Sequence, residues 1–250
     1  MKSRKLDEKE SRVFHTFVAK ALYACKRARP DLMPTVAHLC ARVKEPNVSD
    51  QHKLTRMMTH IRDHVNDNLR LKGRNVIVAG ADAAFAVHDD MKSHTGVTIT
   101  IGKGSFHNDS KKQKLVTKSS CEAELVAADT GVTHLLWTKW FCEAQGCKVT
   151  SRPTLLQDNE SAIKLETRGK LSSSQRTRHI NIRHFFITDN VGQRNAQVQH
   201  CPTDQLAADF HSKPLQGAKF IMFKAEIMNL PELKSELQGV ESPTRKRGGA

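Results

Sequence analysis

The sequence predicts an α/β fold in which a mixed five-stranded sheet carries helices on both faces and follows a small all-helical segment. Three observations support this prediction. Apolar residues recur every three or four positions between residues 11 and 66, which is the period of a helix. Three strand-like runs then follow in a row. After them comes one long amphipathic stretch, and after that strand-like and helix-like segments alternate.

The first segment, residues 1–72, is expected to hold three helices. Pro30, Pro34 and Pro46 interrupt the helical pattern and divide it. The third helix, roughly residues 49–66, places several apolar residues along one side. These are Leu54, Met57, Met58, Ile61 and Val65.

The second segment, residues 73–215, is expected to begin with three strands. Residues 75–87 are rich in Val, Ile and Ala, and residues 97–101 alternate strictly between Val or Ile and Thr. Gly102-Lys103-Gly104 predicts a tight hairpin connection, and a third short strand is expected at 105–108.

The rest of the second segment is expected to alternate between helices and strands. A long helix is predicted over 119–145, with Gly146 just past its end. The further elements are a strand at 154–157, a helix at 161–167, a polar basic loop at 169–178, a helix at 180–191, a strand at 196–200 and a helix at 203–212 that Pro214 stops. Residues 216–250 are predicted to form a C-terminal helix and a disordered basic tail.

The composition favours a polyanionic partner. The chain has 40 Lys and Arg against 26 Asp and Glu, a net charge of +14, which suits nucleic acid as much as it suits a merely solvated surface. The six cysteines show no Cys-x-x-Cys pair, which argues against a zinc ribbon and fits reduced thiols. No signal peptide or membrane span is visible. We therefore expect an intracellular protein, in the cytoplasm (including a virus-like particle) or the nucleus.

Two acidic residues stand out on the predicted strands. Asp82 lies within an apolar strand, where a carboxylate is costly unless something pairs with it. Asp158 follows the strand that ends at Gln157, and α/β sheets usually bind ligands at such strand ends. For Asp158, a turn-forming Asp-Asn pair is an equally good explanation.

Two helices each offer a choice between acids. Ser119-x-x-Glu122 is a capping box that already explains Glu122, whereas Glu124 lies beside the apolar stripe and has no such explanation. Asp204 follows the expected N-cap Thr203 and suits the helix dipole. Asp209 would lie in the middle of the last helix, between apolar neighbours. Glu124 and Asp209 are therefore the candidates.

Carboxylates gathered without histidine or cysteine favour a hard cation, Mg²⁺ or Mn²⁺. Two such ions about 4 Å apart clamp a phosphodiester, one activating water and the other stabilising the leaving oxygen. A structural cation site would use the same acids. The basic composition favours a nuclease.

Seven short motifs resemble, in order, the ribonuclease H domain of Ty1/copia-type retrotransposon Pol proteins, and cover about residues 75–220. They are Ala81-Asp82-Ala83, Ser93-His94-Thr95-Gly96, Ser110-Lys111-Lys112-Gln113, residues 119–125, Gln157-Asp158-Asn159, residues 178–183, and Cys201-Pro202-Thr203 with residues 208–214. Residues 11–70 look like the end of the same family's reverse transcriptase, its thumb and connection region.

This resemblance implies a ribonuclease H fold, two Mg²⁺ or Mn²⁺ ions, and cleavage of the RNA strand in an RNA–DNA hybrid. It implies that Asp82, Glu124, Asp158 and Asp209 are the catalytic metal ligands. His200 matches the family's histidine that assists proton transfer or product release, although a solvated strand-end histidine is the simpler reading. The Tyr-x-Asp-Asp motif of the polymerase is absent from this sequence, so the missing reverse transcriptase palm is an expected partner.

Basic residues around these motifs are candidates for phosphate contacts, which position a substrate without reading its sequence. They are Lys111, Lys112, Lys114 and Lys118 before the long helix, and Arg176, Arg178 and Arg183 around the polar loop. The alternative to a nuclease is a catalytically silent, nucleic-acid-binding remnant of the element. A strand transferase of the integrase kind is disfavoured by the glutamate on the long helix and by the Ala-Asp to Lys-Pro ending.

Overall fold

The computed structural model describes residues 3–168 and 181–233, and of residues 181–184 only the backbone. It contains the predicted mixed five-stranded sheet, with strands in the order β3-β2-β1-β4-β5. The strands are β1 (Lys72–Ala84), β2 (His94–Lys103), β3 (His107–Lys112), β4 (Thr154–Gln157) and β5 (Gln197–His200). β1, β2 and β3 pair antiparallel, whereas β4 and β5 run parallel to β1.

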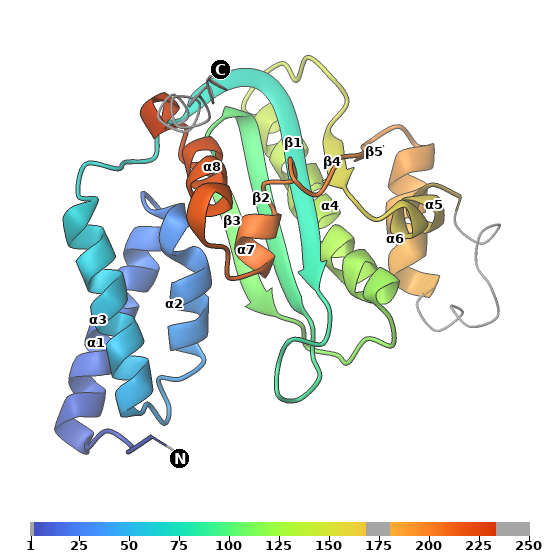
Figure 1. The fold of residues 1–250 in the computed structure, drawn as a ribbon. Helices are drawn as coiled ribbons and strands as arrows, with labels where there is room; N and C mark the ends of the chain where they lie inside the picture. Colours follow the sequence, from blue (N-terminus) through green and yellow to red (C-terminus); the bar gives the residue numbers. More distant parts are fainter. Residues whose placement is uncertain (1–2, 169–180, 234–250) are drawn as a thin grey trace, which may run out of the picture.

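Helices cover both faces of the sheet, as predicted (Figure 1). One face carries α4 (Ser120–Ala144), α5 (Glu160–Arg168) and α6 (Asn181–Gly192). The opposite face carries the short α7 (Asp209–Ser212) and α8 (Gly217–Ile227). The main core lies between β1, β2, β4 and α4, and it includes Ile77, Val97, Leu135 and Leu155, all fully buried.

The N-terminal segment forms a helical unit with its own apolar core, which lies beside the edge strand β3 (Figure 1). Its helices are α1 (Glu8–Cys25), the 3-10 turn η1 (Pro30–Leu32), α2 (Met33–Cys40) and α3 (Val48–Asp63). α1 begins with a capping box made by Asp7 and Glu10. Pro30 begins η1 after α1, and Pro46 lies between α2 and α3, so these two prolines separate helices as predicted, whereas Pro34 is the second residue of α2.

Polar contacts join this unit to the rest of the chain. Lys224 of α8 is almost fully buried, and its ammonium lies 2.6 Å from Asp67 and 3.9 Å from Asp31. Asp31 also accepts two hydrogen bonds from the buried guanidinium of Arg29. The helical unit and α8 therefore share one buried network of charges.

Several predicted elements differ in the structure, and the first strand, for example, ends at Ala84 rather than at residue 87. The third strand begins at His107 rather than 105, because Ser105 belongs to the loop, where its hydroxyl oxygen lies 3.0 Å from the carbonyl oxygens of Ile99 and His107. The predicted helix 203–212 is only the short α7, preceded by turns in which the N–H of Gln205 donates to Pro202 and that of Asp209 donates to Leu206.

All six cysteines lie in the described part of the chain, and none of them forms a disulfide bond there. Among the helices of residues 3–168 and 181–233, none combines the length and the apolar character needed to cross a membrane.

Candidate active site

Three of the predicted acids meet at one end of the sheet. Oxygen atoms of Asp82, Glu124 and Asp158 all lie within 4.8 Å of one another. Asp82 is near the end of β1, Glu124 is in the first turns of α4, and Asp158 directly follows β4. Because β1 and β4 run parallel, their ends bring the two aspartates to the same edge, and α4 supplies the glutamate above it.

Glu124 and Asp82 are buried at this site. Burial raises the pKa of Glu124 to about 9, and repulsion from Asp82 and Asp158 adds to that rise. One oxygen of Glu124 is buried without a hydrogen-bond partner among the described residues. Burial also raises the pKa of Asp82, although Lys213 and a hydrogen bond from Ser212 oppose the change. Ionisation of these buried carboxylates is therefore unfavourable, and a bound cation would stabilise their ionised forms.

Glu122 contributes to the N-cap of α4, where the sequence predicted a capping box. Its N–H donates to the hydroxyl of the N-cap Ser119, and its own carboxylate accepts from the N–H of Lys118 at 2.6 Å. The carboxylate thus reaches one residue further than in a standard capping box. Asp204 is exposed in the turn before α7.

Asp209 is fully buried next to this group but is not a member of it. Its carboxylate forms ion pairs with Lys213 and with Lys219, the latter at 2.5 Å. It stands at the first residue of α7, so its predicted position in the middle of a helix was wrong.

Lys213 and Ser212 complete the surroundings of Asp82, and the sequence reasoning did not select either of them. The Ser212 hydroxyl donates to one carboxylate oxygen of Asp82, and the Lys213 ammonium lies 3.4 Å away. Burial lowers the pKa of Lys213, but Asp82 and Asp209 outweigh it and hold that pKa above its usual value. Ser212 and Lys213 both lie within the sequence motif 208–214, and the spacing of four residues between Asp209 and Lys213 is that of a helical ion pair.

Gly96 lets α7 approach the sheet closely. It pairs with Asp82 across β1 and β2, and a Cβ atom built on it would lie 2.5 Å from the carbonyl oxygen of Ala208 and 2.6 Å from the nitrogen of Ser212. A side chain there would push α7 away from Asp82.

Asp158 and His200 lie at the carboxyl ends of the neighbouring strands β4 and β5. The hydroxyl of Thr203 donates to Asp158 at 2.7 Å. His200 ends β5, where it pairs with Gln157, the residue before Asp158, and it is exposed. The structure thus places His200 near the strand end that carries Asp158, and within the described part of the chain His200 forms no hydrogen bond or ion pair with any of the four acids.

The basic residues predicted to contact phosphate differ in their surroundings. Lys111 pairs with Asp109 at 3.1 Å and Lys112 pairs with Asp90 at 2.8 Å, so both are already engaged on β3. Lys114 and Lys118 are exposed in the connection between β3 and α4. Arg176 and Arg178 lie outside the described residues, and of Arg183 only the backbone, in α6, is described.

Among the proteins similar to this chain are retrovirus-related Pol polyproteins of plant transposons. The Pol polyprotein of transposon TNT 1-94 from Nicotiana tabacum is 28% identical over 214 residues, which are 84% of this chain and 16% of that polyprotein. The corresponding polyprotein of transposon RE1 from Arabidopsis thaliana is 29% identical over 202 residues, which are 80% and 14% of the two chains. This chain therefore spans less than a fifth of the length of these relatives. No protein-family model matches it.

Solved structures with similarity to the chain include an RNase H1 isolated from compost, with a TM-score of 0.40 and 19% identity over 52% of this chain and 87% of that one. A foamy viral protease-reverse transcriptase in complex with an RNA/DNA hybrid gives a TM-score of 0.46 and 12% identity over 87% and 27% of the two chains. The curated homologues of this chain are retrovirus-related Pol polyproteins of plant transposons, and it matches one short part of them.

Proposed function

We propose that the chain is a metal-dependent endonuclease that cleaves the RNA strand of RNA–DNA hybrids, as a part of a Ty1/copia-type retrotransposon Pol protein. The observation that carries the proposal is the meeting of Asp82, Glu124 and Asp158 from three separate elements. The seven sequence motifs and the Pol homologues agree with it. In this proposal residues 73–215 form the nuclease unit.

The three acids fit a divalent cation. They supply only oxygen ligands, which Mg²⁺ and Mn²⁺ prefer. An oxygen of Glu124 has no hydrogen-bond partner among the described residues, and a bound cation would remove the electrostatic cost that raises the pKa of Glu124 and Asp82. When two ions are bound, they would supply an activated water and stabilise the leaving 3′-oxygen of the cleaved strand.

The residues around the acids would orient them. Ser212 donates to Asp82 and Thr203 donates to Asp158, so each aspartate has one oxygen fixed. Asp209 would complete the second metal position, which requires its ion pairs with Lys213 and Lys219 to open. His200, exposed at the end of β5, would exchange protons with water or product at that edge.

Nucleic acid would approach over the connection between β3 and α4, where Lys114 and Lys118 are exposed. Lys111 and Lys112 would contact phosphate only in competition with Asp109 and Asp90.

The proposal is tested with a labelled RNA–DNA hybrid, with Mg²⁺ and with EDTA. We expect Mg²⁺-dependent cleavage of the RNA strand, abolished in Asp82→Asn and in Asp158→Asn while the circular dichroism spectrum stays unchanged. The matched control is Asp204→Asn, because Asp204 is also a nearby acid but is exposed. Cleavage by either site variant at the wild-type rate would refute the assignment.

A silent nucleic-acid-binding remnant is the second candidate, and one observation favours it. Lys213 and Lys219 already neutralise Asp209, and Lys213 also lies beside Asp82. This candidate predicts salt-sensitive hybrid binding without Mg²⁺-dependent turnover. Comparing hybrid, duplex DNA and duplex RNA in the same assay separates the two functions.

A further inference from the structure

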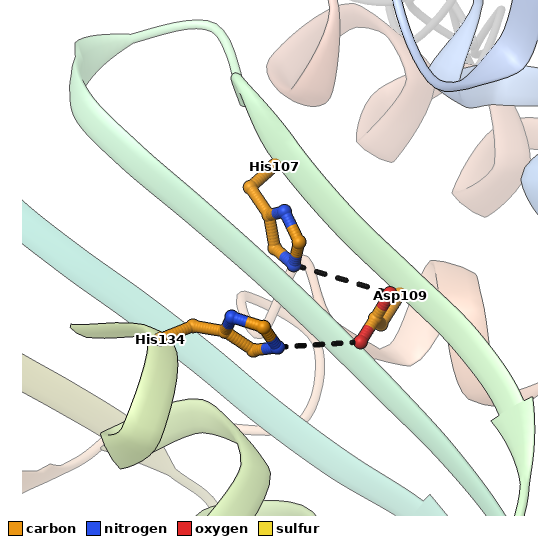
Figure 2. Close-up of side chains that lie close together, drawn as sticks. All are labelled: His107, Asp109 and His134. Carbon is orange, nitrogen blue, oxygen red and sulfur yellow. Dashed lines mark ion pairs between the residues drawn. The ribbon is translucent and has the colours of Figure 1, made fainter. Parts of the chain in front are cut away.

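A second cluster of potential metal ligands lies away from the three acids. His107 and Asp109 are two residues apart on the edge strand β3, so their side chains point to the same face of the sheet. α4 covers that face, and its His134 points toward them (Figure 2). His134 follows Glu124 by ten residues in α4, which separates the two groups by about 15 Å along the helix.

The ligand atoms are nearly close enough to share an ion. Nε2 of His107 lies 3.9 Å from one oxygen of Asp109, and Nε2 of His134 lies 3.6 Å from the other (Figure 2). One such atom from each residue falls within 4.8 Å of the other two. A tetrahedral Zn²⁺ site with bonds of about 2.0–2.1 Å needs ligand atoms about 3.3 Å apart. Small side-chain rotations would close the difference.

The histidines are available as ligands. Nε2 of His107 is buried and has no hydrogen-bond partner within the described part of the chain, which is unusual for a buried polar atom. The side chains of His107 and His134 are 32% and 35% exposed, so the cluster lies near the surface of the protein.

Two lysines form ion pairs with the carboxylate of Asp109. Lys26 and Lys111 lie 3.0 Å and 3.1 Å from the two oxygens of Asp109. Their side chains are 39% and 49% exposed, so the Lys111 ammonium can turn into water when a cation arrives, whereas that of Lys26 would keep its 2.9 Å hydrogen bond to the carbonyl of Asn108. The lysines would therefore compete with a metal ion for Asp109 without blocking access to the histidines.

We propose that His107, Asp109 and His134 form a second metal site, which takes a transition-metal ion of the Zn²⁺ class rather than Mg²⁺. Two imidazoles and one carboxylate are ligands that Zn²⁺ favours, and the fourth position would hold water. The ion would fasten the edge strand β3 to α4, because His107 and Asp109 come from one and His134 from the other.

The test is titration of the full chain with Co²⁺, whose visible absorption reports tetrahedral coordination, followed by competition with Zn²⁺. Excess Mg²⁺ is present to fill the acidic site, and Cys147→Ser serves as the parent to remove the exposed thiol. We expect one bound ion per chain and a melting temperature that rises with Zn²⁺ concentration. His107→Gln and His134→Gln should each weaken Co²⁺ binding by more than about tenfold. Replacing even an outer-shell partner of a metal ligand typically weakens metal binding by roughly 10–100-fold.

Two further variants complete the design. His88→Gln is the matched control, because His88 also faces a second histidine, His94 at 3.1 Å, but neither belongs to a ligand group in the described residues. Lys111→Ala should bind Co²⁺ severalfold more tightly, a gain that loss of folding cannot imitate. The proposal would be refuted if the Cys147→Ser parent bound no Co²⁺ in the presence of excess Mg²⁺. It would also be refuted if the two histidine variants bound Co²⁺ as tightly as the parent. Unchanged affinity in Lys111→Ala would count against Asp109 as a ligand.

Discussion

The ammonium of Lys213 lies 3.4 Å from Asp82 and also forms an ion pair with Asp209. A single protonated lysine therefore stands between the three-acid group and the fourth predicted acid. Since these carboxylates raise its pKa despite burial, the lysine keeps its charge at neutral pH. It must compete with any divalent cation for both aspartates.

Replacing this lysine should strengthen Mg²⁺ binding. In Lys213→Met the positive charge near Asp82 is gone, and one unit charge at about 4 Å is worth about 1 kcal/mol even in bulk water. We expect the dissociation constant for Mg²⁺ to fall about fivefold or more, measured by isothermal titration calorimetry. Lys164→Met, an exposed lysine on α5, should leave the constant unchanged. Weaker Mg²⁺ binding in Lys213→Met would mean that the lysine organises the acids instead of competing for them.

Glu166 should make the stability of the protein fall as the pH rises. It is fully buried on α5, and burial raises its pKa to about 8. Between the ordinary value of 4.5 and about 8, the folded state keeps a proton that the unfolded state has released. The folded state therefore binds more protons, and the free energy of unfolding decreases with pH across this window.

Glu166→Gln should flatten that dependence and make the protein more stable than wild type at pH 8. Urea unfolding at several pH values in EDTA measures the free energy of unfolding and its dependence on pH. Glu124 contributes a slope of the same sign, so part of the decrease will persist in the variant. Glu160→Gln, an exposed glutamate in the same helix, is the control and should follow the wild-type curve. An equally steep curve for Glu166→Gln would contradict the prediction.

The order of helices and strands could be read from the sequence because local patterns determine it. The alternation in residues 97–101 marks β2, and Ser119 caps α4 where it was predicted to. The turns before α7 escaped prediction, because the apolar residues Leu206 and Ala208 look helical in sequence. In the structure they pack in a small cluster with Cys201 and Leu156. Tertiary packing here overrides helix propensity.

The choice between the two glutamates near the start of α4 could also be made from the sequence. Capping chemistry separated Glu124 from Glu122 without any structure, whereas nothing in the sequence showed that Asp209 would pair with Lys219. The His107, Asp109 and His134 cluster could not be foreseen either. Strand pairing and the packing of α4 bring its members together, and the sequence spacing between Asp109 and His134 matches no metal-binding motif.

Lys224 should be important for the attachment of the N-terminal helical unit. It is 2% exposed, and its partners Asp67 and Asp31 both belong to that unit. Lys224→Met should lower the free energy of unfolding by about 3 kcal/mol, because breaking a buried pair leaves its partner charge uncompensated. Equilibrium urea unfolding measures the change. Arg62→Met removes the exposed pair with Asp63 and should have little effect. Equal stability of the two variants would show that α8 is held by apolar contacts alone.

Gly96→Ala should disturb both stability and the site through the same displacement. The added methyl group would lie 2.5 Å from the Ala208 carbonyl oxygen and 2.6 Å from the Ser212 nitrogen, and backbone atoms cannot rotate away as a side chain does. α7 must therefore shift, at a cost of about 1–3 kcal/mol or more.

The shift would carry Ser212 away from Asp82, so hybrid cleavage should fall by more than the loss of folded protein explains. Unfolding curves and cleavage rates of the folded fraction measure the two effects separately. Gly192→Ala is the matched control, because no atom lies within 4 Å of a Cβ built there. A Gly96→Ala protein with wild-type stability and wild-type cleavage would show that α7 does not need its close approach to β2.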